Sequence, residues 1–371
     1  SIIYAGAQVL FRSLDRGDHW EEISPDLTTD DDSKEHGEGN ISYCTLTTIA
    51  ESPVKPGVIW TGADDGRVQV TRDGGATWLD RTAKLTAAGA PETFWVSRVF
   101  PSPHDAGTSF VAKTGLRFDL FQPVLYKTTD YGETWTNIAG DLPAGKPLNA
   151  VIQDRKNPDL LFAGTEQGVY VTLDAGKAWW PFKANMPWLK VTDLLIHPRE
   201  NDLVVATFGR SLWVTDISPL QELSDATLAE DVHLFDIKPR TQRVTGGIGN
   251  YQLLGDSHLS TPNEPNAVAV SYYLKAKAAG PVKITIADPY GQVVGELAGK
   301  GDAGLNTVLW FMRVQRAGQR QEGFEGFYGG RLVDPGEYVV TLDAGGKKLT
   351  KKAVIRGRQG WTVGPVPVEI K

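Results

Sequence analysis

Apolar and polar residues alternate in short runs along the first part of the chain. The run 58–62 (VIWTG) is followed by a turn at 64–66 (DDG) and a second run at 67–71, and the segment 160–172 repeats this order. Period-two alternation bounded by Gly-containing turns is typical of strands joined in hairpins. A further apolar run that ends near a proline precedes these hairpins, and a short run follows them. The pattern therefore predicts units of four strands.

One phrase, [S/T]-x-D-x-G-x-x-W, occurs four times, beginning at Ser13, Thr71, Thr128 and Thr172, and a shortened copy begins at Thr215. The copies are roughly 40 to 60 residues apart, which is the length of a four-stranded propeller blade. We therefore expect an all-β protein: a partial β-propeller of about five four-stranded blades, followed by a small Ig-like β-sandwich.

Each residue of the phrase has a structural use. The aspartate accepts backbone N–H groups in a tight turn, the glycine permits a left-handed conformation, and the tryptophan packs between blades. We assign these residues to the scaffold rather than to chemistry. They are Asp15, Gly17, Trp20, Asp73, Gly75, Trp78, Asp130, Gly132, Trp135, Asp174, Gly176 and Trp179.

The alternation changes character near residue 219, where the repeat ends. We expect propeller blades over 1–218, a linker with a short helix and a strand over 219–265, an Ig-like β-sandwich over 266–356 and a tail over 357–371. Turns every 8 to 12 residues in the third segment favour a sandwich.

Composition limits the functions to be considered. The 371 residues carry a net charge of −7 and include 40 glycines, 11 tryptophans and one cysteine. No basic stripe suggests a nucleic-acid partner, and no apolar stretch is long enough to span a membrane. Cys44, in the alternating run 41–49, is expected to be a buried thiol on a strand, because no second cysteine exists to pair with it.

Three segments depart from the repeat. Residues 115–123 lengthen the hairpin of the third unit, and such an insertion serves either recognition or the burial of Phe118 and Phe121. The acidic run 26–38 reads as a solvated loop, with a cation site as the alternative. His104 with Asp105, or His197, would be the residues of a metal site, but neither has ligand-like spacing. We predict no metal and no cofactor.

The four copies of the phrase resemble the Asp-box, or bacterial neuraminidase repeat, of sialidases, xyloglucanase-type glycosidases and sortilin-type propellers. The segments 59–75, 125–135 and 208–216 are similar to a secreted bacterial family that is described as sortilin-like or glycosyl-hydrolase-like. The segments 304–310 and 333–338 resemble the Ig-like module of flagellar hook-capping proteins. The resemblance implies an extracytoplasmic protein, periplasmic or secreted, whose signal peptide is not on this chain.

The family also implies further blades upstream, which agrees with a chain that opens on a strand in the middle of a blade. The first unit lacks an inner strand and the last lacks an outer one. Exposed sheet edges promote aggregation. We therefore expect these edges to be covered by another polypeptide or by an upstream part of the same precursor.

Two functions compete. The first is a non-catalytic propeller that binds a protein, peptide or glycan, or serves as a scaffold subunit. The second is a glycoside hydrolase that uses paired carboxylates, although the Arg-Ile-Pro phrase of sialidases is missing. The candidate catalytic acids are Asp64, Asp65, Asp119 and Glu166. The candidate binding residues are Trp95, Arg98, Arg117 and Arg210, with Trp188 as a further stacking surface.

Overall fold

The computed structural model describes residues 2–31, 43–183, 185–243, 265–314 and 331–357. The chain divides into two compact units, Ser1–Gln221 and Glu222–Lys371. The sequence segments 244–264 and 358–371, which include nearly half of the predicted linker and all but the first residue of the predicted tail, lie outside the described residues, as do residues 32–38 of the acidic run.

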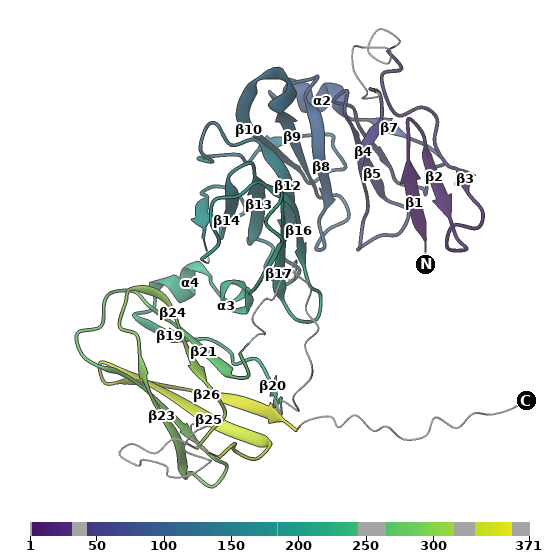
Figure 1. Cartoon of the computed structure of the whole chain (residues 1–371). Coiled ribbons are helices and arrows are strands. Elements are labelled where there is room, and N and C mark those ends of the chain that lie inside the picture. The colour runs from purple at the N-terminus through teal and green to yellow at the C-terminus, as the bar shows by residue number, and fades with distance from the viewer. Residues whose placement is uncertain (1, 32–42, 184, 244–264, 315–330, 358–371) are drawn as a thin grey trace, which may run out of the picture. The chain divides into compact units, whose positions relative to one another are not determined.

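The first unit consists of five antiparallel sheets that follow one another in chain order (Figure 1). We number them blades 1 to 5. In the described part of the chain, the three middle blades have four strands each, and blades 1 and 5 have three.

Blade 1 contains β1 (Ile3–Gly6), β2 (Leu10–Ser13) and β3 (Glu21–Glu22). Blade 2 contains β4 (Leu46–Glu51), β5 (Ile59–Ala63), β6 (Val68–Thr71) and β7 (Leu79–Asp80). Blade 3 contains β8 (Trp95–Pro101), β9 (Ser109–Gly115), β10 (Leu120–Thr128) and β11 (Thr136–Asn137). Blade 4 contains β12 (Leu148–Gln153), β13 (Leu161–Thr165), β14 (Gly168–Thr172) and β15 (Trp180–Phe182). Blade 5 contains β16 (Val191–Ile196), β17 (Asp202–Thr207) and β18 (Leu212–Asp216).

One structural feature is shared by the inner strands β4, β8, β12 and β16. Each has a register shift within its first three residues. In three of them the side chain at the shift donates a hydrogen bond to the backbone carbonyl of the residue just before the shift in the next inner strand. The bonds are Thr47 to Val96 (2.6 Å), Ser97 to Leu148 (2.8 Å) and Asn149 to Val191 (3.0 Å).

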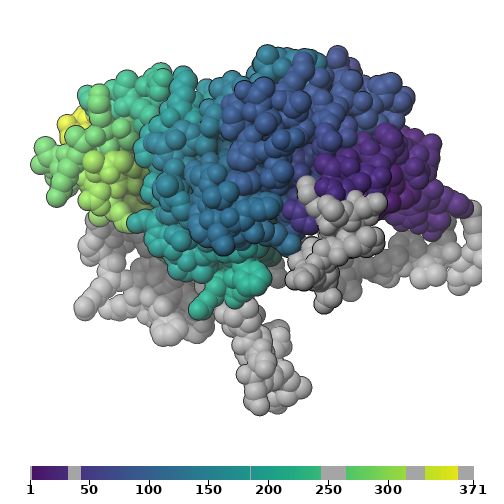
Figure 2. All heavy atoms as spheres, turned by 90° about the horizontal axis from the view of Figure 1, so that it is seen from above, coloured from purple at the N-terminus to yellow at the C-terminus, as the bar shows by residue number. Residues whose placement is uncertain are grey.

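An ion pair joins inner strands that are not neighbours. Arg98 on β8 contacts Asp193 on β16 at 2.5 Å, so blades 3 and 5 meet at a common centre. Between neighbouring blades, apolar side chains of both sheets form a shared core. Trp60 of blade 2 packs with Val111 of blade 3, and Phe162 of blade 4 packs with Val205 of blade 5. Figure 2 shows these blades as one continuous body, from purple through blue to teal. The described sheets therefore confirm the predicted partial β-propeller.

Two short helices interrupt the strands of this unit. Helix α2 (Thr82–Ala87) follows the outer strand of blade 2, and the 3-10 turn η1 (Leu116–Phe118) lies in the insertion of blade 3. The sequence patterns predicted neither. Among the described residues, no helix is both long and apolar enough to cross a membrane.

The second unit is a sandwich of two sheets. One sheet has the order β19-β21-β24, and the other β20-β26-β25-β22-β23. Side chains from both sheets, such as Tyr272, Ile284, Trp310 and Val340, share a single core. The strands are β19 (Val232–Leu234), β20 (Arg240–Thr241), β21 (Val268–Leu274), β22 (Val282–Ala287), β23 (Val293–Gly299), β24 (Gly304–Trp310), β25 (Gly336–Ala344) and β26 (Lys347–Arg356).

The predicted linker 219–265 contributes to this sandwich. Strand β19 pairs with β21, and β20 pairs in parallel with β26. Where a single short helix was expected in the linker, the structure has two, α3 (Ser218–Gln221) and α4 (Asp225–Ala229). The sandwich therefore begins before residue 266. The strand predicted within the linker is β19, which belongs to the sandwich, whereas β20 is a run of two residues that is too short to show alternation.

Candidate binding site on the propeller

The blades have two structurally different ends. The repeated turns lie beside the loops that join the first and second strands of each blade, as three backbone hydrogen bonds of 2.9 Å show. These bonds join Gly74 N to Gly57 O, Tyr131 N to Gly107 O and Ala175 N to Asp159 O. We call this the turn end. The hairpins between the second and third strands define the opposite hairpin end.

The four repeated turns make the same three hydrogen bonds. The Ser or Thr hydroxyl donates to the aspartate Oδ1, the glycine N–H donates to that hydroxyl, and the N–H of the residue before the tryptophan donates to Oδ1. In blade 2 these distances are 2.8, 3.0 and 2.9 Å, for Thr71, Gly75 and Thr77. The equivalent bonds occur at Asp15, Asp130 and Asp174.

These bonds favour the charged form of the aspartates. The side-chain and backbone hydrogen bonds from Thr77 lower the pKa of Asp73 to about 2. The backbone and side-chain bonds from His19 lower the pKa of Asp15 to about 2. Each turn glycine has a positive φ, for example 105° at Gly75. The carboxylates thus hold the turn, and their acceptor positions are used by the chain itself.

The turn tryptophans pack toward the preceding blade. The Nε1 of Trp78 donates to Ile23 O at 3.0 Å, and that of Trp179 donates to Ile138 O at 2.9 Å. Trp135 lies edge-on to Trp60. Trp20 contradicts the expectation for all four, because it is 45% exposed. It belongs to blade 1, which has no preceding blade among the described residues.

The shortened copy at Thr215 does not form this turn. Asp216 instead accepts hydrogen bonds from the N–H and hydroxyl of Ser218, where helix α3 begins. The glycine that the turn requires is missing at this copy, so the chain turns into a helix.

The candidate catalytic acids do not form a pair across a cleft. Asp64 and Asp65 are buried, and both accept backbone N–H groups: Asp64 from Thr45 at 2.9 Å, and Asp65 from Thr29 at 2.6 Å and from Arg67 at 3.0 Å. Burial raises the pKa of Asp64. Both carboxylates order the loops that enter blade 2.

The other two acids are also used locally. Glu166 accepts a hydrogen bond from Asn149 at 3.0 Å and pairs with Lys190 at 2.9 Å. Asp119 is exposed and ends η1 in a left-handed conformation with φ 54°. The four acids therefore lie on three different blades.

The structure brings together two of the predicted binding residues, Trp95 and Arg117. The guanidinium carbon of Arg117 lies 3.6 Å from the centroid of the Trp95 ring. Trp95 also donates from Nε1 to the hydroxyl of Tyr43 at 3.2 Å. Beside them, Phe118 stacks on Phe94 at 5.8 Å. We call these five residues the Trp95 cluster; it lies at the hairpin end of blades 2 and 3.

A buried lysine supports the loop below the cluster. Lys113 on β9 is fully buried, and its Nζ donates to the carbonyls of Pro91 and Glu92 at 2.8 and 2.9 Å. Burial lowers the pKa of Lys113 to about 8. The lysine thus fixes the loop that leads into Phe94 and Trp95.

The insertion of blade 3 exposes apolar side chains beside Arg117. The alternative in which it buries Phe118 and Phe121 is wrong, because they are 41% and 43% exposed. Leu116 and Leu120 are also exposed. Isolated exposed apolar residues are ordinary, but several of them on one loop form a candidate interaction surface.

The remaining candidate binding residues lie away from the Trp95 cluster. Arg98 is engaged by Asp193 at the centre of the propeller. Arg210 is exposed, and its backbone carbonyl accepts the Nε1 of Trp213. Trp188 is half exposed, with Lys146 Nζ 4.5 Å from its ring centroid. None of the three contacts the Trp95 cluster through a described bond or ring contact.

The residues considered for a metal site make hydrogen bonds to other protein groups. The Nε2 of His104 lies 2.7 Å from Asp154 O, Asp105 accepts the hydroxyl of Thr108, and Nδ1 of His197 accepts the N–H of Glu200. Within the described ranges, no group of three or more His, Cys, Asp or Glu residues could hold a metal ion. Cys44 is buried as expected, but with φ 62° it precedes β4 rather than lying on a strand.

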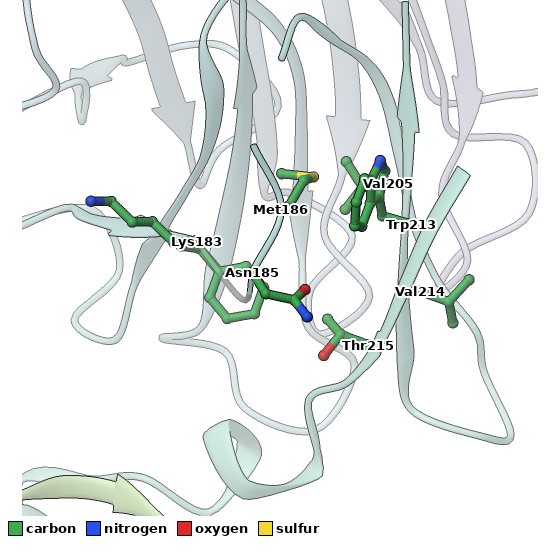
Figure 3. Close-up of a pocket in the computed structure, with 8 residues that line it drawn as sticks. Lys183, Asn185, Met186, Val205, Trp213, Val214 and Thr215 are labelled. Carbon is green, nitrogen blue, oxygen red and sulfur yellow. The ribbon is translucent and has the colours of Figure 1, made fainter. Parts of the chain in front are cut away.

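A cavity of about 250 Å³ lies along β18 of blade 5. Met186, Val205 and Trp213 line it on one side of the strand, whereas the side chain of Val214 points away from them (Figure 3). The cavity follows the strand edge that an outer strand covers in blade 4. It contains none of the candidate acids.

No protein-family model matches the chain, and no curated protein matches it. Solved structures with a similar fold include an ancestral GH74 enzyme (13% identity, TM-score 0.44, 94% of this chain and 44% of that one). The GH74 xyloglucanase from Xanthomonas campestris is similar as well (16%, 0.44, 94% and 62%), and so is YCF48 bound to D1 peptide (13%, 0.38, 81% and 86%). The chain thus spans less than two thirds of the two GH74 enzymes. These similarities concern the fold only. The assignment of a β-propeller rests on the sheets described above.

Proposed function

We propose that the chain is a non-catalytic, extracytoplasmic β-propeller of the Asp-box type that binds an extended peptide carrying a carboxylate. The observation that carries the proposal is the exposed guanidinium of Arg117, stacked on Trp95 and flanked by the exposed apolar side chains of the insertion. The Ig-like module that the resemblance implies would be the second unit, acting as a spacer.

The geometry of Arg117 suits an anionic group. A guanidinium that stacks on an indole loses little hydration and keeps its in-plane N–H groups available. Such a preoriented fork binds a carboxylate through two parallel charge-assisted hydrogen bonds. Leu116, Phe118 and Leu120 would then contact apolar side chains next to that carboxylate.

A peptide fits this site better than a neutral glycan does. Sugars bind tryptophan through an open ring face, and Arg117 covers one face of Trp95 at 3.6 Å. The exposed side chains beside it are Leu and Phe, which contact apolar peptide residues rather than hydroxyl groups.

Selection from a displayed random-peptide library on the whole chain would test the proposal. We expect selected peptides to carry an acidic residue or a free C-terminus next to apolar residues. In fluorescence anisotropy with a selected peptide, Arg117→Ala should weaken binding roughly 10- to 100-fold, because a charge-assisted hydrogen bond is lost.

Arg72→Ala is the matched control. Arg72 also stacks on an aromatic ring, with its Cζ 4.1 Å from the Tyr131 centroid, but it belongs to a repeated turn at the turn end. Its removal should leave peptide binding unchanged. Peptide binding that is indifferent to Arg117, or equally weakened by both substitutions, would contradict the proposed site.

The glycoside hydrolase remains the second candidate through the resemblance to xyloglucanase-type enzymes. Its test is hydrolysis of xyloglucan by the whole chain, compared with Asp65→Asn and Glu166→Gln. The proposal predicts no hydrolysis above a buffer blank. Release of sugar that either substitution abolishes would favour the enzyme. Cell fractionation of the native host, with the protein found outside the cytoplasm, would test the proposed location.

A further inference from the structure

A group of lysines and aromatic rings lies at the hairpin end of blade 4, outside the site proposed above. Lys146 lies on the loop that enters β12, Tyr170 lies on β14, and Lys183 and Trp188 lie between β15 and β16. We call these four residues the Trp188 cluster. Blade 4 shares one apolar core with blade 3 and another with blade 5, so both of its neighbours in the propeller are described.

The ammonium group of Lys146 is held in a defined position. Its Nζ donates to the hydroxyl of Tyr170 at 2.5 Å, and Tyr170 is buried. The same Nζ lies 5.1 Å from the centroid of the Tyr170 ring and 4.5 Å from that of the Trp188 ring. Aromatic rings at such distances attract a cation. The carbonyl of Pro147, the next residue, accepts the N–H of Glu166 at 3.1 Å, so the backbone beside Lys146 is also tied to the hairpin.

Trp188 is placed by the same hairpin. The N–H of Gly168 donates to the carbonyl of Leu189 at 2.7 Å. Gly168 has φ 98°, and a Cβ there would lie 2.7 Å from Cε3 of Trp188. The ring therefore packs closely on a glycine, yet Trp188 remains 50% exposed. The Nζ of Lys183 lies 5.4 Å from the centroid of this ring, so two ammonium groups flank one exposed tryptophan.

These two ammonium groups have no carboxylate partner in the part of the chain that the structure describes. Glu166, the acid of the blade 4 hairpin, is instead paired with Lys190 at 2.9 Å. Like charges near one another raise the electrostatic energy of a site. An anion from a ligand would lower it and would find Lys146 already in place.

We propose that the Trp188 cluster binds a phosphate or sulfate group of a ligand. An ammonium group is a compact point charge with three donors, which suits a tetrahedral oxyanion, whereas the planar fork of Arg117 suits a carboxylate. Tyr170 takes one donor of Lys146, and two remain for the anion. The exposed part of Trp188 would pack against the group that carries the anion. The site is separate from the Trp95 cluster and does not depend on the proposed function.

Isothermal titration calorimetry of the whole chain at low salt tests this inference. The probes are glucose 6-phosphate, glucose 6-sulfate, inorganic phosphate, glucuronate and glucose. We expect at least one of the two esters to bind more tightly than glucuronate, and glucose not to bind. Inorganic phosphate that binds as tightly as the esters would identify the free ion as the ligand, whereas tighter binding of an ester would identify an esterified anion.

Lys146→Met should weaken binding of the tighter ester roughly tenfold, because it removes a charge-assisted hydrogen bond. Methionine keeps an apolar stem between the rings, and a circular dichroism spectrum would check folding. Lys183→Met, at an exposed residue, should weaken binding less, and it tests the site even if Lys146→Met fails to fold.

Lys127→Met is the matched control. The Nζ of Lys127 lies 5.9 Å from the centroid of the Phe110 ring, but Phe110 is buried and no second cation contacts it among the described residues. Its removal should leave binding unchanged. The proposal is overturned if neither ester binds, if glucuronate binds as tightly as the esters, or if both substitutions in the Trp188 cluster leave binding unchanged. Equal weakening by Lys127→Met would also overturn it.

Discussion

The turn end and the hairpin end of the propeller differ in how they use polar side chains. At the turn end, four aspartates make the same three bonds at nearly the same distances. At the hairpin end, blade 2 uses two buried aspartates, blade 3 an exposed apolar insertion and blade 4 a Glu166–Lys190 pair. Repetition therefore marks the scaffold, whereas the departures from it mark the surface where a ligand would bind.

The largest effect should come from a turn glycine. A Cβ on Gly75, which has φ 105°, would lie 2.4 Å from the carbonyl oxygen of Ile23. We expect Gly75→Ala to lower the free energy of unfolding of the propeller by roughly 3–5 kcal/mol, from backbone strain and a clash with backbone.

Its neighbour Gly74 provides the control for urea unfolding followed by tryptophan fluorescence. It has φ 76°, but a Cβ there would meet nothing within 4 Å. Gly74→Ala should cost only about 1 kcal/mol. Equal losses for the two substitutions would show that close packing at the turn end does not matter.

The buried lysine of the hairpin end should make stability depend on alkaline pH. The pKa of Lys113 is about 8 in the folded protein, against 10.5 for an exposed lysine. Between these values the unfolded chain binds more protons, so the free energy of unfolding should rise with pH.

The rise attributable to Lys113 should total about 3 kcal/mol between pH 8 and 10.5. It would be measured as the difference between the wild type and Lys113→Met in urea unfolding at each pH. A difference that is constant across this range would mean that the lysine is not desolvated.

A turn aspartate should contribute less to the free energy of unfolding than a turn glycine does. Asp73→Ala removes bonds to Thr71 and Thr77, and we expect a loss in the free energy of unfolding at neutral pH that is smaller than the loss caused by Gly75→Ala. Because the pKa of Asp73 is lowered, its contribution is present above pH 4 and disappears as the pH falls toward 2. Asp119→Ala, at the exposed end of η1, should change stability by less than about 0.5 kcal/mol. If Asp119→Ala cost as much as Asp73→Ala, the distinction between the two ends would fail.

The smallest effect on stability should come from the insertion itself. Phe121 is exposed, so we expect Phe121→Ser to alter the free energy of unfolding by no more than about 0.5 kcal/mol. In thermal unfolding, a much larger loss would mean that the insertion is part of the core rather than a surface for a ligand.

The repeated turns show what can be predicted from sequence. Their bonds join residues within five positions of one another, so the phrase alone specifies them. The order of blades 1 to 4 also follows from the four full copies of the phrase. Helix α2 and the two-residue strand β20 could not be predicted, because they depend on distant parts of the chain rather than on local alternation.

The Trp95 cluster could be predicted from the sequence only in part. Trp95 and Arg117 could each be predicted as a binding residue from the sequence. Their contact could not be predicted, because it depends on where the insertion folds back over β8. The available signal was the insertion itself: a hairpin that other blades close with a few residues here contains Leu116, Phe118 and Phe121. The exposure of Trp20 was missed because the phrase gives no information on whether a preceding blade is present.

Hydrogen–deuterium exchange of the whole chain, with and without a selected carboxylate-bearing peptide, tests the division between the two ends most directly. The account predicts added protection in the segments 92–95 and 114–121, with exchange at the repeated turns 71–78 and 128–135 unchanged. Protection centred on those turns, with none at Trp95 and Arg117, would contradict it.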